Sequence, residues 1–173
     1  MSSVEKRFDF RNRTVTRLRV RVLGAVIAAA AVAFAPWAAA QNAPRPEALI
    51  KWRQSAYQVI AWNSGRIKAS LAGQYAPHEI QAAATTLAAV ANSGLAALFA
   101  PGTADGKGWR ETTARDEAFN DAQKFRALTE EFAREASTLA RLAAAGDRAT
   151  VNEQFLKVAQ ACKACHEKYR QTD

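Results

Sequence analysis

The chain has 173 residues, of which 24 are Lys or Arg and 16 are Asp or Glu, so its formal charge is +8 at pH 7. Most of this excess lies at the start: residues 1–40 hold seven basic and two acidic side chains, which leaves seventeen basic and fourteen acidic ones on residues 41–173. That balance is ordinary for one small domain. The composition therefore gives no support to a nucleic-acid-binding or membrane-binding function, and we expect neither partner.

The first forty residues have the organisation of a secretory signal peptide. Seven basic side chains within residues 1–21 precede an uncharged run, residues 22–40, which ends in three alanines. This order predicts cleavage before Gln41, with residues 41–173 forming the mature domain. The run is long enough to span a bilayer, so a membrane anchor is the alternative, but its Ala-rich end favours cleavage. Because no adjacent Arg-Arg pair marks a twin-arginine signal, we expect Sec-type export to the periplasm.

Beyond the leader, an Ala-rich sequence is divided at a few places into long helical segments. We expect the first helix over residues 46–73, with a proline in its first turn and a glycine at its end. The second is expected over residues 77–99, followed by a loop at residues 100–108 that contains glycines and a proline. The third is expected over residues 113–144, and the pair at residues 146–147 suits a terminal glycine followed by the N-cap of a fourth. Long helices with short links predict an all-α, antiparallel four-helix bundle.

The last helix has the clearest apolar period in the chain. Its apolar and cysteine side chains follow one another at intervals of four and three residues, which is typical of a core-facing helix: Val151, Phe155, Val158, Cys162, Cys165 and Tyr169. Both cysteines are therefore expected to face the bundle interior.

These cysteines belong to a C-x-x-C-H motif, the pattern of c-type haem attachment. In such sites two thiols bond covalently to the haem, and the following histidine, here His166, ligates the iron. Cys162 and Cys165 are the only cysteines of the chain. A disulfide or thioredoxin-like pair is the alternative, but that motif belongs beside a βαβ unit. We predict one covalently attached haem c, buried between the helices.

The residues available for the other face of the iron are few. Met1 is the only methionine and lies in the leader, so an axial His/Met pair is excluded in the mature chain. The other histidine, His78, is expected in the exposed first turn of the second helix, with a bis-His site as the alternative. Lys51, Lys68, a free terminal amine or the Tyr57 phenolate would each have to lose a proton that it normally holds at neutral pH. We expect a five-coordinate iron with an open position.

Four stretches of the mature chain resemble cytochrome c′, the class II family of c-type cytochromes: residues 53–57, 62–67, 99–103 and 162–170. The resemblance extends over residues 45–170. It implies an antiparallel four-helix bundle with the C-x-x-C-H motif near its C-terminus. Low-spin members of the class place a methionine on the first helix as sixth ligand, and this chain has none there. The resemblance therefore implies the high-spin, five-coordinate branch.

The resemblance also implies roles for individual residues. Tyr57 corresponds to the bulky residue over the open iron position, which excludes water and weak ligands; an ordinary core aromatic is the alternative. Ile60 is expected to line the same pocket, and Phe99 resembles the aromatic residue at the haem edge. Helix spacing adds two further residues: Arg53 lies four residues before Tyr57 on the same face, so it is expected to bind one haem propionate, unless it is a solvated surface cation, and Gln54 the other.

Arg170, one turn beyond His166, is expected on the proximal side of the haem. By resemblance, basic residues there accompany nitric oxide binding on the histidine side, and simple compensation of the helix dipole is the alternative. The family usually forms homodimers through its first two helices, so we expect a homodimer, with Trp52 and Trp62 at a helix or subunit contact.

Two functions are compatible with these features. The first is binding of nitric oxide or carbon monoxide at the open position, which would buffer nitric oxide; the second is transfer of single electrons between periplasmic donors and acceptors. We favour the first because a vacant iron site reorganises more during electron transfer than a six-coordinate one. No distal histidine or acid–base pair is evident, so we expect that the protein is not an enzyme.

Overall fold

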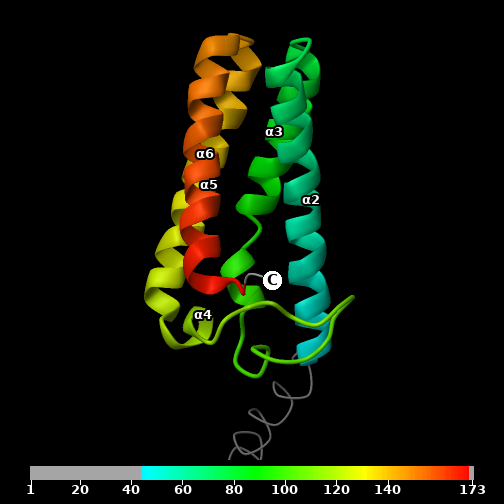
Figure 1. Cartoon of the computed structure of the whole chain (residues 1–173), viewed down its shortest axis with the longest axis vertical. Coiled ribbons are helices and arrows are strands. Elements are labelled where there is room, and N and C mark those ends of the chain that lie inside the picture. Colours follow the sequence, from blue (N-terminus) through cyan, green and yellow to red (C-terminus); the bar gives the residue numbers. More distant parts are fainter. Residues whose placement is uncertain (1–43, 172–173) are drawn as a thin grey trace, which may run out of the picture. The chain divides into compact units, whose positions relative to one another are not determined.

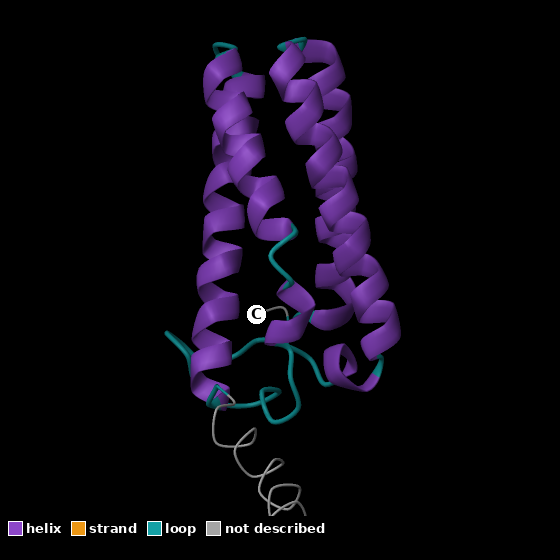
Figure 2. Ribbon diagram, turned by 180° about the vertical axis from the view of Figure 1, so that it is seen from behind, coloured by secondary structure: helices purple, strands orange, loops and turns teal. Residues whose placement is uncertain are grey.

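The computed structural model describes residues 44–171, and the signal peptide predicted at residues 1–40 lies outside the described residues. Four long helices form an antiparallel bundle, as predicted (Figure 1). Their bounds, with those of a 3-10 helix and one short helix, are α2 (Pro46–Ala72), α3 (Pro77–Ala91), η1 (Leu95–Leu98), α4 (Glu117–Asn120), α5 (Ala122–Ala145) and α6 (Arg148–Tyr169). The described part of the chain contains two isolated β-bridges and no strand (Figure 2).

The start and end of α2, the end of α5 and the start of α6 lie where the sequence predicts them. Pro46 is the first residue of α2, and Gly73 follows its last residue. Gly146, with φ +78°, ends α5 in the left-handed region that glycine adopts without strain. Asp147 then caps α6, because its carboxylate accepts a hydrogen bond of 2.7 Å from the backbone N–H of Thr150.

The two middle helices are shorter than predicted. The second ends at Ala91, and Gly94, with φ +84°, redirects the chain into η1 instead of continuing the helix to residue 99. The third begins at Ala122 rather than near residue 113. Residues 113–115 pair with the end of α6 instead: Gln171 donates its N–H to the carbonyl of Thr113 at 2.8 Å. Their backbone groups are satisfied by this pairing, so these residues do not need a helix.

Successive long helices pack against one another: α2 on α3, α3 on α5, and α5 on α6. The start of α6 lies beside the end of α2, where Arg148 donates to the carbonyl of Leu71 at 2.7 Å. Most of the large side chains that are fully buried in the shared core are aliphatic, among them Ile67, Leu87 and Leu139. Burying each such side chain contributes about 1.5–3 kcal/mol.

The apolar stripe predicted on α6 faces this core. Val151, Val158 and Tyr169 are buried, and both cysteines are partly buried. A second, aromatic cluster, formed by Phe125 and Tyr169 with Ala118, lies towards the C-terminal end of α6. No helix within residues 44–171 is both long and apolar enough to cross a bilayer.

Candidate functional site

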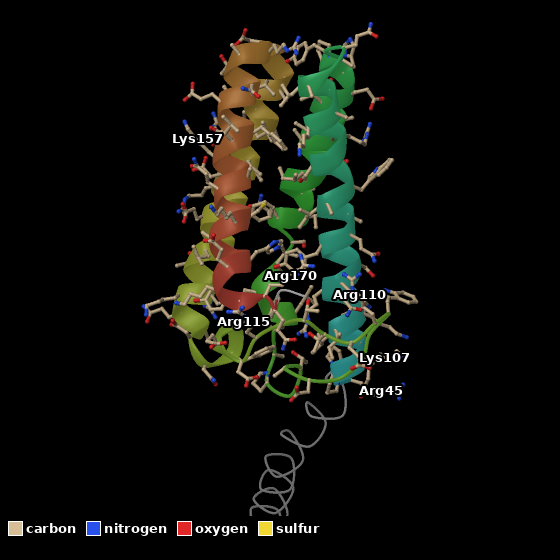
Figure 3. All side chains as sticks on the ribbon, in the orientation of Figure 1. Arg45, Lys107, Arg110, Arg115, Lys157 and Arg170 are labelled. Atoms are coloured by element: carbon tan, nitrogen blue, oxygen red, sulfur yellow. The ribbon has the colours of Figure 1, made fainter. Side chains whose placement is uncertain are left out.

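A cavity of about 470 Å³ lies between α2, α5, α6 and the loop that follows η1. Ligand cavities of small molecules and cofactors usually measure about 300–1,000 Å³. Because α2 and α6 run in opposite directions, Arg53 lies at the same end as Arg170, whereas Ile60 lies at the level of Cys162. We call the end that contains Arg53 and Arg170 the polar end, and the end that contains Ile60 and Cys162 the apolar end. Arg110 and Arg170, both labelled in Figure 3, line this cavity.

The cysteines and the histidine of the motif line this cavity. Burial raises the pKa of both thiols, and for Cys165, with a further contribution from Cys162, to about 11. Both thiols are therefore protonated and uncharged at neutral pH. Partial desolvation and, second, the charge of Arg170 lower the pKa of His166. The imidazole is consequently neutral at pH 7, which is the form that ligates metals.

Tyr57, Ile60 and Phe99, which were predicted to lie over the iron and at the haem edge, also line the cavity. The rings of Tyr57 and Phe99 meet edge to face, with their centroids 6.4 Å apart. Burial, with smaller contributions from Cys165 and Cys162, raises the pKa of Tyr57 above its ordinary value. The phenol therefore keeps its proton at neutral pH and is a poor iron ligand.

Arg53 is 3 % exposed, so the alternative of a solvated surface cation is wrong. Its guanidinium donates to Thr103 at two atoms, the hydroxyl at 2.9 Å and the carbonyl at 2.7 Å, and also to the hydroxyl of Thr112. The same group lies over the rings of Phe99 and Phe119, at 4.9 and 5.8 Å from their centroids. Burial lowers the pKa of Arg53. No carboxylate among the described residues pairs with this buried cation.

Gln54 lies beside Arg53, and its amide positions the loop. Its Oε1 accepts the backbone N–H of Trp109 at 2.7 Å, and its Nε2 donates to the carbonyl of Arg110 at 2.9 Å. Gly108 packs closely against α2, since a Cβ there would lie 2.5 Å from Gln54 Oε1 and 2.9 Å from the backbone nitrogen of Lys51. Gln54 thus places Arg110 at the polar end of the cavity, a contact that no pattern in the sequence indicates.

The alternative iron ligands lie elsewhere. Lys51, Lys68 and His78 are exposed, and none of them lines the cavity. Lys51 lies over the ring of Trp109, 5.1 Å from its centroid. Among the described residues, the cavity therefore contains one histidine, His166, and no lysine.

Several lining residues were not predicted. From α5 they are Phe125, Leu128, Thr129 and Phe132, and from the loop they include Arg110, Thr112 and Thr113. The α5 group has the spacing i, i+3, i+4, i+7, which marks one face of a helix and could have identified them. The loop residues give no such signal because their position depends on contacts with distant parts of the chain.

Comparison with known proteins gives a consistent result. The model of the family described as Cytochrome C' matches residues 48–170. The cytochrome c′ of Rhodocyclus tenuis is 49% identical over 130 residues, which are 75% of this chain and 98% of that protein.

Solved structures show the same similarity. A cytochrome c′ described as having a ligand-controlled dimer dissociation has a TM-score of 0.72 and 42% identity, over 75% of this chain and 99% of that one. Two variants of the Alcaligenes xylosoxidans cytochrome c′ also match. The form with carbon monoxide bound has a TM-score of 0.65 and 33% identity over 74% and 98% of the chains. The nitric oxide complex has a TM-score of 0.67 and 32% identity over 76% and 100%. This chain belongs to the cytochrome c′ family.

Proposed function

We propose that this protein is a periplasmic cytochrome with one covalently attached haem c, whose open distal position binds nitric oxide and carbon monoxide and thereby buffers nitric oxide. The observation that most directly supports this function is the joint placement of Cys162, Cys165 and His166 on the wall of one cavity that also contains Tyr57. Two thiols and a neutral imidazole are the groups that c-type haem attachment requires.

The charges of the cavity fit the same cofactor. Three arginines line it, Arg53, Arg110 and Arg170, and no aspartate or glutamate among the described residues does. A buried cation without an anion is costly, so the polar end needs a negatively charged group. The two propionates of a haem supply such groups. Arg53 keeps N–H donors beyond the three hydrogen bonds to Thr103 and Thr112, so it can bind one of them.

The protein's residues would determine which ligands enter. A haem iron with a vacant position binds nitric oxide and carbon monoxide. His166 would hold the iron from one side. Tyr57, protonated and in contact with Phe99, would cover the other side and exclude water, so that only a strong ligand could displace it. Arg170, which already lowers the pKa of His166, would limit imidazolate character and weaken donation to the iron. We propose binding rather than catalysis for this site, where no acid–base pair is evident among the described lining residues.

The structures of relatives support the ligand class and the assembly. Variants of the Alcaligenes xylosoxidans protein bind carbon monoxide and nitric oxide, and another relative dissociates from a dimer under ligand control. We infer a homodimer for this chain as well. Trp52 and Trp62 on α2 are 52% and 69% exposed, with Val59 between them, and they form an apolar face suited to a subunit contact.

An absorption spectrum of the purified ferrous protein, before and after addition of nitric oxide or carbon monoxide, tests the open position. We expect a broad, high-spin spectrum that changes with either gas. Sharp low-spin bands without added ligand would contradict the open site and favour single-electron transfer between periplasmic partners. Cell fractionation tests the location, since the haem protein should be released with the periplasmic contents.

Substitution of Tyr57 tests whether it controls access. Tyr57→Ala should raise carbon monoxide affinity by about tenfold or more, which corresponds to about 1.4 kcal/mol. Tyr57→Phe is the matched control, because it keeps the ring and should leave the affinity close to that of the native protein. Equal affinities for Tyr57→Ala and the native protein would reduce Tyr57 to a packing residue.

A further inference from the structure

Within residues 44–171, the hydroxyl of Tyr169 is a buried side-chain group with no hydrogen-bond acceptor. The neighbouring ammonium of Lys168, whose pKa is raised by its interaction with this hydroxyl, can donate to the oxygen but cannot accept its proton. Tyr169 is 3 % exposed and lines the cavity. Buried hydroxyls are nearly always paired, and an unpaired one costs about 1–3 kcal/mol. A group bound in the cavity can supply the missing acceptor.

Neighbouring contacts hold Tyr169 in place. Its ring meets that of Phe125 edge to face, with centroids 5.2 Å apart and planes at 85°. Its carbonyl accepts the N–H of Arg115 at 2.9 Å, and Gln171, two residues on, donates to the carbonyl of Thr113 at 2.8 Å. The backbone on both sides is therefore paired.

The chemistry of the occupant limits the possible acceptors. This step rests on the proposed function, in which the cavity holds a haem. The four porphyrin nitrogens face the iron, so the propionate carboxylates are the groups of the haem that accept strong hydrogen bonds. Tyr169 is next to Arg170 in the chain and lines the same cavity as Arg53, and the positive charge of these arginines favours a carboxylate. The Tyr169 hydroxyl, which lacks an acceptor, and the arginines, which have no carboxylate among the lining residues, therefore lie at the same end of the cavity.

We propose that Tyr169 donates its hydroxyl proton in a hydrogen bond to a haem propionate at the polar end of the cavity. The phenol is neutral and the carboxylate is charged, so the bond is charge-assisted and short, with an O···O distance of about 2.5–2.7 Å. Tyr169 would then be a haem-binding residue on α6 in addition to the three residues of the C-x-x-C-H motif.

A crystal structure of the haem-loaded native protein tests this contact directly. We expect the Tyr169 hydroxyl oxygen within hydrogen-bond distance of a propionate oxygen. A hydroxyl bonded only to ordered water, bonded to another protein group, or still unpaired would overturn the proposal. A purified chain without attached haem would instead contradict the proposed function, so the two failures are distinguishable.

Tyr169→Phe, which keeps the ring against Phe125, tests the same bond in solution. Without the donor the propionate retains more of its negative charge and stabilises the ferric state, so the midpoint potential should fall. The propionate bending band in the resonance Raman spectrum should shift as well. Tyr75→Phe is the control: Tyr75 donates to the carbonyl of Gly146 at 3.0 Å, far from the cavity, and its loss should change neither readout. A Tyr169→Phe protein with native potential and band position would refute the proposal.

Discussion

The apolar and polar ends of the cavity are built in different ways. At the apolar end, Ile60 and Cys162 project from two long helices, and their positions follow from helical periodicity. At the polar end, Arg53 is held by Thr103 and Thr112, which are 50 and 59 residues away in the sequence. One end therefore depends on local helix geometry, and the other depends on the path of a loop. The contrast predicts different sensitivities to mutation.

The largest effect of mutation is expected for the two cysteines that line the cavity. In a protein with both Cys162→Ser and Cys165→Ser, covalent attachment of the haem should be abolished, because no other thiol exists in the chain. Haem staining of a denaturing gel measures this loss directly. A stained band at the position of the double variant would contradict the assignment of the motif.

At the polar end, Arg53→Leu should lower the free energy of unfolding by about 2–3 kcal/mol, because it leaves two buried oxygens of Thr103 and the partly buried hydroxyl of Thr112 without their donor. Denaturant unfolding of the haem-loaded protein measures the change. Lys51→Leu is the control on the same helix; Lys51 is exposed, and its substitution should change stability by no more than about 0.5 kcal/mol. Similar losses in both variants would show that Arg53 does not organise the loop.

Substitution of two glycines by alanine distinguishes the effect of loop packing on stability from the effect of helix propensity. Gly108→Ala should destabilise the protein by about 1–3 kcal/mol, because the new Cβ would meet Gln54 and the backbone of Lys51. Gly65→Ala should instead stabilise it by about 0.5–1 kcal/mol, since Gly65 lies inside α2 with nothing within 4 Å of an added Cβ. Thermal unfolding compares the two, and a stabilising Gly108→Ala would refute the close fit of the loop.

The smallest effect is expected far from the cavity, at the N-cap of α6. The hydrogen bond from Thr150 lowers the pKa of Asp147, so its contribution to stability is present above the ordinary carboxyl pKa and is lost as pH falls through the lowered value. Asp147→Ser keeps a capping oxygen without the charge, so its melting temperature should depend less on pH in the acid range. Carbon monoxide affinity should stay native, and a changed affinity would show that the two regions are coupled.

The helical part of the fold could be predicted because its signals are local. Pro46, Gly73 and the Gly146–Asp147 pair mark helix ends, and the period of α6 places the cysteines on the cavity side. The predicted end of the second helix was wrong, because the turn at Gly94 interrupts a stretch whose composition is otherwise typical of a helix.

The polar end could be predicted only in part. The sequence indicates that Arg53 belongs to the site, but not that Thr103 and Thr112 bind it. Gln54 was assigned to a propionate, whereas its amide also holds Trp109 and Arg110. None of these contacts follows from residue spacing, because each joins α2 to a loop that lies 50 or more residues further along the chain.

The long sequence separation between Arg53 and its hydrogen-bond partners also affects the order in which the domain folds. Helices form within about a microsecond, whereas contacts between distant residues form later because they require closure of long loops. The final segment, through Gln171, must also be present to pair with Thr113. We therefore expect the polar end to be the last part of the domain to assemble, which would leave the interior accessible while the helices are already formed.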